Sequence, residues 1–423
     1  MPRNIWPMVL FIALSATPQI AAQEAGHYGA LVDANARFAF KFFRQSLAKT
    51  PDNNVLTAPI ALSRDFAFLQ NGADAEAREE ILRAFELGNL SSDEINQQSL
   101  ALHKALSYPQ PHPPTPPSRR PPNEKAPPPA ICCEPPPERL ILAGSLWVQP
   151  NVAFRTTFLE RSKKFYSFQT VSVPSRGPAA ASAVNTWVSR QTGGALTHVL
   201  DSWQRDDFLL ADTTWFKGAW IHPFVASRTH PGDFTLLSGQ KKQVPMMVEG
   251  GSFAYLRGAN FQAVRLPYHH AAMYVFLPDE DSSLKEFEQS LTADKWAAWI
   301  SDFEGHEGYL ELPRFRSEYR APITAILEDL GVERAFTSFG SFAPAVSNPE
   351  GAALTRVLQV ILLSVDEKGT EVVSAGVIGG VIGGVPGGPR PEPFRMIVNR
   401  PFFFAICDDQ TRAILYMGRI VAP

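Results

Sequence analysis

The chain has 423 residues, of which 45% are hydrophobic and 19% are charged. This composition is typical of a globular protein with a substantial core, and the length alone permits two or three domains. The formal net charge of −3 and the pI of about 6.3 exclude a strongly charged protein, so we expect no nucleic-acid partner.

The first 22 residues have the pattern of a secretory signal peptide. Arg3 supplies a positive charge, residues 6–14 are apolar, and small residues precede Gln23. A membrane anchor is the alternative, but the apolar run is shorter than the roughly 20 residues that a spanning helix needs. We therefore predict that residues 1–22 are removed, that the mature chain 23–423 is secreted to the extracellular space or the periplasm, and that it has no membrane attachment.

Helices dominate the next part of the chain. Apolar residues recur at helical spacing in 35–47, where Asn35 is placed to cap the helix, and again in 75–87. A third helix is expected to begin at Ser91 and run toward Leu106, because Ser91 and Glu94 have the spacing of a capping box.

Residues 107–138 form a proline-rich insert. Fourteen of the chain's 37 prolines lie between Pro109 and Pro137, a composition that forms neither a helix nor a central strand. We expect an exposed surface insertion, and the alternative is a preformed polyproline ligand for an aromatic groove.

After the insert, the pattern changes from helices to strands. Short apolar runs bounded by turn residues predict strands at 140–148, 208–215, 263–266, 273–277, 309–312 and 357–365. Helices such as 181–191, 284–290 and 323–330 fall between them. Helices grouped early and strands grouped late, without regular alternation, favour an α+β domain with large, mostly antiparallel sheets.

The three cysteines do not form a disulfide framework or a metal-binding pattern. Cys132 and Cys133 are adjacent within the insert, and Cys407 lies in an apolar stretch where we expect a buried thiol. The pair His269 and His270 is isolated, and the chain has neither a G-x-S-x-G elbow nor an H-E-x-x-H motif. We therefore expect no metal, no cofactor and no enzymatic activity.

Several motifs together resemble the serpin family over almost the whole mature chain. Each motif is weak alone, but they occur in the family's order at 184–188, 192–194, 216–220, 244–247, 312–315, 330–332, 366–371, 399–404 and 416–419. The resemblance implies helices clustered around three mostly antiparallel sheets, with an exposed reactive loop.

The resemblance also implies a mechanism. A serpin's loop is bait for a protease, and after cleavage it enters a sheet as a new strand while the protease is held as an acyl-enzyme. We therefore predict a single domain at 23–423, with the hinge and reactive loop at 367–398. It would act as a monomeric suicide inhibitor of a serine-type protease.

The hinge must slide between two existing strands, so it needs small side chains. The expected hinge residues are Glu367, Lys368, Gly369, Thr370, Glu371, Val372, Val373, Ser374 and Ala375. The two valines have high β propensity but are bulkier than the alanines usual in the family. The glycine-rich run 376–388 suits a bait loop, although glycine costs backbone entropy when a strand forms.

The position of the scissile bond depends on the direction of counting. The family spacing counted forward from Glu367 gives Gly383, and counted back from Asn399 it gives Arg390. We prefer Gly383, because the sheet fixes the inserted length and because Arg390 is followed by Pro391. The neighbourhood Ile382, Gly383, Gly384 and Val385 suits elastase-like or subtilisin-like proteases.

The region where the sheet must open departs from the family. It usually carries hydroxyls, an Asn and a His, whereas the matching positions here are Ala58, Ala61, Asp212 and Gln359, with Trp220 near the place where the loop first enters. Asp212 and Gln359 are able to pair as acceptor and donor. The sequence is compatible both with a rebuilt polar network and with its loss. The alternative function is therefore that of a non-inhibitory serpin, acting as a secreted carrier or as a plain protease substrate.

Overall fold

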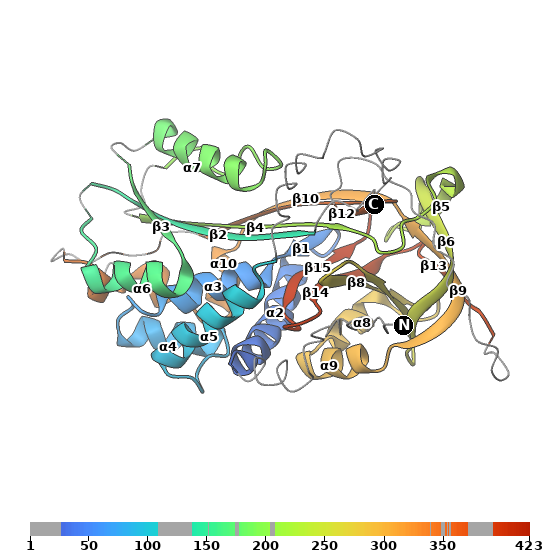
Figure 1. Cartoon of the computed structure of the whole chain (residues 1–423), viewed down its shortest axis with the longest axis horizontal. Coiled ribbons are helices and arrows are strands. Elements are labelled where there is room, and N and C mark those ends of the chain that lie inside the picture. Colours follow the sequence, from blue (N-terminus) through green and yellow to red (C-terminus); the bar gives the residue numbers. More distant parts are fainter. Residues whose placement is uncertain are drawn as a thin grey trace, which may run out of the picture.

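The computed structural model describes residues 27–108, 138–150, 152–173, 177–203, 208–338, 340–347, 357–370 and 392–423, together with Ala352 and Leu354. Most helices lie toward one end of the molecule, and long strands run from them to the other end (Figure 1). The expected α+β class is confirmed.

Helices are present at each range where helical periodicity predicts one, and four more were not predicted. Their bounds are α2 (Gly29–Lys49), α3 (Pro59–Leu69), α4 (Ala75–Ala84), α5 (Ser92–Ala105), α6 (Thr156–Tyr166), α7 (Pro178–Gln191), α8 (Leu284–Ser290), α9 (Ala293–Ser301), α10 (Thr324–Asp329) and α11 (Arg334–Thr337). The four that were not predicted are α3, α6, α9 and α11. The capping box of α5 is confirmed, since the Ser91 hydroxyl accepts from the Glu94 amide and the Glu94 carboxylate accepts from the Ser91 amide. Asn35 as a cap is wrong, because α2 begins at Gly29 and Asn35 is buried within it.

One sheet has six strands. Their order is β10 (Phe315–Pro322), β11 (Leu358–Asp366), β12 (Gly369–Thr370), β4 (Phe208–Ala219), β2 (Arg139–Val148) and β3 (Gln169–Ser172). All pairs are antiparallel except β2 with β3. Figure 1 shows α7 on one face of this sheet, with α3, α5 and α6 on the other.

The second sheet has nine strands. Its order is β1 (Val55–Thr57), β15 (Ile414–Ile420), β14 (Phe402–Asp408), β8 (Ala271–Pro278), β7 (Phe261–Pro267), β6 (Lys241–Arg257), β9 (Glu304–Pro313) and β13 (Phe394–Ile397), and β5 (His230–Thr235) also pairs with β6. Three sheets were expected. In the described residues two of them are continuous, because the long strand β6 pairs with β5 and β9 and then, at 254–257, with β7.

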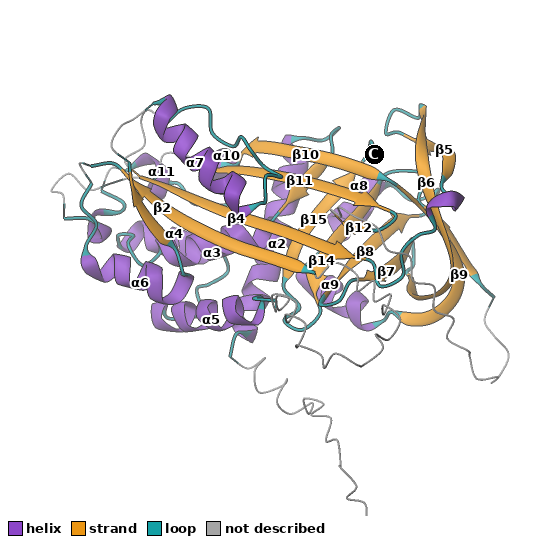
Figure 2. Ribbon diagram, turned by 45° about the horizontal axis from the view of Figure 1, so that its top comes forward, coloured by secondary structure: helices purple, strands orange, loops and turns teal. Residues whose placement is uncertain are grey.

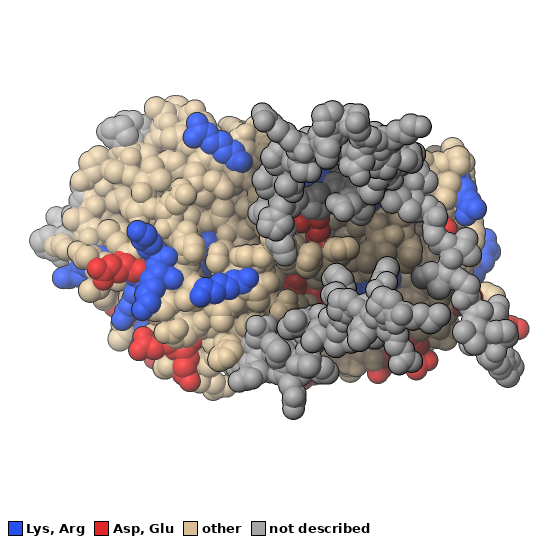
Figure 3. Space-filling model, in the orientation of Figure 1, with Lys and Arg blue, Asp and Glu red and all other residues tan. Residues whose placement is uncertain are grey.

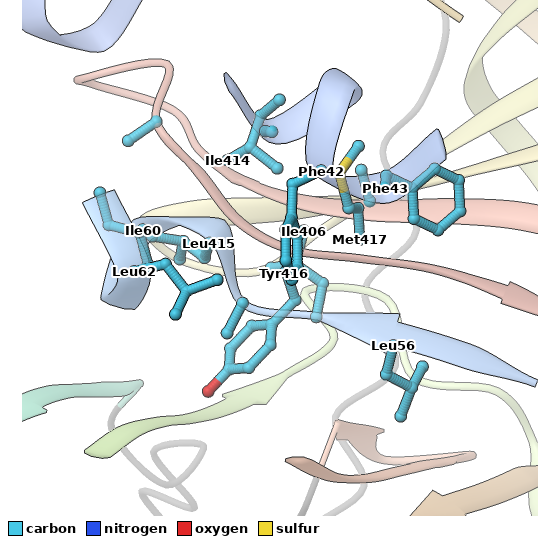
Figure 4. Packing of buried hydrophobic residues seen from close by; sticks show 14 of the residues in the cluster. Phe42, Phe43, Leu56, Ile60, Leu62, Ile406, Ile414, Leu415, Tyr416 and Met417 are labelled. Carbon is cyan, nitrogen blue, oxygen red and sulfur yellow. The ribbon is translucent and has the colours of Figure 1, made fainter. Parts of the chain in front are cut away.

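The core lies where α2 and α3 pack against β14 and β15. Aromatic and branched side chains from the helices interdigitate with the strands, as Phe42, Phe43, Ile60, Ile406 and Met417 show in Figure 4. The rings of Phe43 and Phe403 lie 5.5 Å apart between centroids, a spacing that adds to the hydrophobic stabilisation. This packing makes a rigid base beneath the six-stranded sheet.

No helix in the described ranges is long and apolar enough to cross a bilayer. Cys407 is buried as expected, and burial raises the pKa of its thiol far above the usual range. Residues 109–137 of the proline-rich insert, which include Cys132 and Cys133, and the predicted signal peptide lie outside the described residues.

Candidate functional site

In the part of the chain that the structure describes, the six-stranded sheet is incomplete between its two central strands. β4 pairs with β2 over ten residues, and β11 pairs with β10 over eight. Between β4 and β11 the described residues provide only the two-residue strand β12, at one end (Figure 2). Beside β12, residues 208–217 of β4 and 358–364 of β11 therefore face each other across what we call the slot. Because β12 is antiparallel to both, a strand that continued it would be antiparallel to both as well.

Two hinge residues already occupy the end of the slot. Gly369 pairs with Ala219 and Asp366, and Thr370 pairs with Gly218 and Val365. Gly369 has φ +153°, and a Cβ atom on it would lie 2.1 Å from the Gly218 carbonyl oxygen. Only glycine fits this close backbone approach.

The side chains of Tyr268 and Trp220 bind the hinge. The Thr370 hydroxyl lies 2.5 Å from the Tyr268 hydroxyl, and both groups are buried. The Trp220 ring stacks on Tyr268 with centroids 4.6 Å apart, and the Trp220 indole N–H donates to the Asp366 carbonyl at 2.9 Å. The Trp220 amide donates to the Lys368 carbonyl at 2.9 Å, so this side chain and its backbone bind both ends of the hinge turn.

Glu367 fixes the outer side of the turn. Its carboxylate accepts from the Thr229 hydroxyl at 2.7 Å and forms an ion pair with Arg314, and its carbonyl accepts from the Phe224 amide. Burial alone would raise the pKa of Glu367, but the hydrogen bonds from Arg314 and Thr229 outweigh it and lower that pKa. The carboxylate is therefore a stable anchor at neutral pH.

The expected hydrogen bond between Asp212 and Gln359 is replaced by two separate contacts. The Gln359 side chain accepts from the Ala58 amide at 3.4 Å and donates to the Ala58 carbonyl at 3.3 Å, which connects β11 to the start of α3. The Asp212 carboxylate instead points to Arg64, with 3.4 Å between Oδ2 and Nη1. Ala61 is partly buried and lines the space between them.

Arg64 and Asp65 are the site residues that sequence reasoning missed. The Arg64 guanidinium is buried, donates to the Tyr166 carbonyl at 3.1 Å and lies 4.6 Å from the Phe168 ring centroid. Asp65 is also buried, and its Oδ1 has no hydrogen-bond partner. Burial, and next the charge of Asp212, raise the pKa of Asp65 well above its usual range. The available signal was a pair of charges on an otherwise apolar helix.

Two cavities lie along the slot. The larger one, of about 120 Å³, is bounded by α3, β4, β11 and α7, and its polar lining is Asp65, Asp212, Thr213, Thr214 and Gln359. The smaller one, of about 20 Å³, lies beside Thr370 and is lined by Phe216 and Leu363. These cavities are space that a further strand would fill with its inward side chains.

The remaining predicted site residues fall outside the described part of the chain. They are the hinge residues Glu371, Val372, Val373, Ser374 and Ala375 and the scissile-bond candidates Ile382, Gly383, Gly384, Val385, Arg390 and Pro391.

His269 and His270 lie in the turn between β7 and β8, and in the described ranges no three His, Cys, Asp or Glu side chains are arranged to hold a metal. Lys, Arg, Asp and Glu side chains are mixed on the face shown in Figure 3. This mixture agrees with the small net charge.

The chain resembles known proteins over nearly its full length. The family model described as Serpin (serine protease inhibitor) matches residues 33–423. Human alpha-1-antichymotrypsin is 28% identical over 402 residues, covering 93% of this chain and 88% of the relative. Serpin A3-2 of Bos taurus is 25% identical, with 93% and 89% covered.

Solved structures show the same fold. The thermophilic serpin tengpin in its native state superposes with a TM-score of 0.77 at 24% identity, over 93% of this chain and 94% of that one. Human thyroxine-binding globulin, solved with its hormone, gives 0.78 at 22% identity, over 94% and 99%. Because the family match covers residues 33–423, the chain belongs to the serpin family.

Proposed function

We propose that this serpin is a secreted, monomeric inhibitor of serine proteases with elastase-like or subtilisin-like preference. It acts as a bait and not as an enzyme: the target cleaves the loop, and the freed segment enters the slot as a strand while the protease remains attached. The observation that carries this proposal is the slot itself, with Gly369 and Thr370 already paired at its entrance.

The register of β12 predicts where each inserted residue would come. Continued along β4 and β11, it places Val372 between Phe216 and Leu363, and it places Gly376 between Asp212 and Gln359. Because side chains alternate along a strand, Val372 and Ser374 would face the interior on the same side as Thr370. The small cavity beside Thr370 lies on that side. Glycine opposite Asp212 leaves the carboxylate undisturbed.

The energetics favour insertion of the first half of the loop. Each new backbone hydrogen bond contributes about 0.5–1.5 kcal/mol, and a strand in the slot bonds on both sides. Each glycine after residue 376 costs about 0.5–1 kcal/mol relative to alanine. Residues 371–375 therefore supply most of the driving force, and the glycine-rich part reduces it.

The test is to incubate the mature protein, beginning at Gln23, with elastase, subtilisin, trypsin and chymotrypsin. We expect a complex that survives denaturing gels, and the mass of the released C-terminal peptide identifies the scissile bond. Cleavage without a complex would refute trapping and favour the carrier or plain-substrate function. N-terminal sequencing of the exported protein checks removal of residues 1–22.

A hinge variant separates trapping from simple cleavage. Thr370→Arg places a charge where the side chain is 1% exposed, and burying an unpaired charge costs several kcal/mol. We expect Thr370→Arg to be cleaved but not to trap, and Thr370→Ser, which keeps the hydroxyl, to trap as the wild type does. Equal trapping by both variants would show that strand insertion is not required.

A further inference from the structure

The larger cavity is built like a small ligand site. Its walls are mostly apolar: Ala61, Phe66 and Leu69 lie on the side of α3, and Val184 and Val188 on the side of α7. Its volume of about 120 Å³ approaches that of an engineered cavity of about 150 Å³ that binds benzene. An apolar group close to the size of a benzene ring therefore fits between the two helices.

The polar part of this cavity carries an imbalance of charge. Two carboxylates, those of Asp65 and Asp212, share one cation, the Arg64 guanidinium. Arg64 is also engaged by the Tyr166 carbonyl and the Phe168 ring. Asp65 is 8% exposed, lines the cavity and has an oxygen without a hydrogen-bond partner. A buried carboxylate without a partner is costly, so Asp65 holds a proton until a second cation arrives.

We propose that this cavity binds a small primary ammonium ion attached to an apolar group of about benzene size. The ammonium lies against Asp65 and Asp212, and the apolar group lies between α3 and α7. An anion would be repelled by the two acidic side chains. A neutral alcohol supplies no cation, so Asp65 would stay protonated and would gain no ion pair. A metal ion would find only two carboxylates here, and no three His, Cys, Asp or Glu side chains in the described ranges are arranged to hold one.

Binding is coupled to release of a proton from Asp65. The charged groups that act on this carboxyl are Asp212 on β4 and Arg64 on its own helix. On the other side of Arg64 lies His103 of α5, and burial and the Arg64 charge lower the pKa of His103 to about 4, so it stays neutral. The lining residues of α7 and β11 do not titrate. Affinity therefore rises up to tenfold per pH unit while Asp65 is protonated.

The bound ligand also slows entry of the cleaved loop into the slot, and this consequence rests on the proposed function. The register of β12 brings Gly376 to the position between Asp212 and Gln359, beside the same cavity. An occupied cavity therefore slows insertion of the strand and lengthens the time that the acyl-enzyme has to deacylate. The ratio of cleaved inhibitor to trapped protease rises.

Binding is tested without any protease, on the intact mature protein. Benzylammonium, benzyl alcohol and benzoate serve as matched probes in titration calorimetry at pH 5.5, 6.5 and 7.5. We expect benzylammonium to bind at least tenfold more tightly than either analogue, and more tightly as pH rises. The proposal would be overturned if benzyl alcohol and benzylammonium bound equally tightly, or if the affinity for benzylammonium did not change with pH. It would also be overturned if no probe gave heat of binding, because the cavity then holds only water.

Variants locate the site. Asp65→Asn and Asp212→Asn each leave one carboxylate for Arg64 and none for the ligand, so both are expected to fold and to bind benzylammonium at least tenfold more weakly. Asp52→Asn, on the exposed loop before β1, is the matched control and should bind normally. Unchanged binding to Asp65→Asn would place the ligand elsewhere. Ammonium binding by a protein that traps no protease would refute only the proposed function, whereas trapping without binding would refute only this inference.

Discussion

The two buried carboxylates predict a strongly non-additive pair of substitutions. In the wild type, Asp212 balances the charge of Arg64, and the pKa of Asp65 is raised by burial and then by the Asp212 charge. In Asp65→Asn, a neutral amide replaces a protonated carboxyl. In Asp212→Asn, Asp65 loses the repulsion and ionises to pair with Arg64. Each single variant should therefore lose only about 1 kcal/mol of stability, the ordinary effect of a point substitution.

The double variant leaves the guanidinium without an acid. Removing the partner of a buried charge costs about 3–5 kcal/mol, so the double variant should lose about 2 kcal/mol more than the sum of the singles. Adding Arg64→Met should restore part of this loss, because the unpaired charge is then gone.

The assay is urea unfolding of the native form, followed by tryptophan fluorescence and far-UV circular dichroism for all variants. Coincident transitions with both probes are needed before free energies are compared. A double variant within about 0.5 kcal/mol of the summed singles would refute the shared-cation arrangement, because additivity is the behaviour of independent sites.

Three further substitutions test other parts of the structure. Gly369→Ala should release β12, because the new Cβ would clash with the Gly218 carbonyl and forced backbone strain costs about 1–3 kcal/mol. Faster amide hydrogen exchange at 365–370 would support this, and unchanged exchange would contradict it. Burial raises the pKa of Glu138 to about 7, so its contribution is full below the unfolded value near 4.5 and is lost as pH rises through 7. Glu138→Gln should therefore match the wild type at pH 5 and exceed it by up to about 3 kcal/mol at pH 8 in unfolding measurements, and an equal difference at both pH values would contradict this. Ser91→Ala removes the capping box of α5 and should cost about 1 kcal/mol in urea unfolding, with Gln97→Ala, exposed on the same helix, as the comparison and equal losses in both as the contrary result.

Much of the fold could be predicted because the spacing of apolar residues along the sequence indicates the helices and strands. The apolar spacing of 75–87 and the alternation at 208–215 gave helix α4 and strand β4 without tertiary information. Asn35 was misplaced as a cap because cap residues are also tolerated inside a helix: the apolar face of α2 already begins at Leu31 and Val32, and Asn35 lies on that buried face. The joining of two expected sheets through β6 depends on long-range pairing, which periodicity does not encode.

The hinge turn could be predicted from the sequence, whereas the polar network around Arg64 could not. Gly369 and Thr370 are neighbours in a short motif, so their role in the turn could be expected. Arg64 meets Asp212 only after the chain has folded α3 beneath β4, and neither residue's own neighbours indicate the contact. Their pairing shows that the altered region keeps polar contacts, with a guanidinium on α3 as the cation of the network.

The base of the proline-rich insert and the hinge meet on one turn. Tyr108 and Glu138 flank the insert: the Tyr108 ring stacks on His270 with centroids 4.6 Å apart, and the Glu138 carboxylate accepts from the His270 amide at 2.6 Å. Two residues earlier in the same turn, Tyr268 holds Thr370. A surface insertion would be independent of the hinge if its ends were anchored elsewhere. Here the buried side chains of Tyr108 and Glu138 both contact His270, and Tyr268 in the same turn binds Thr370 at the end of the slot.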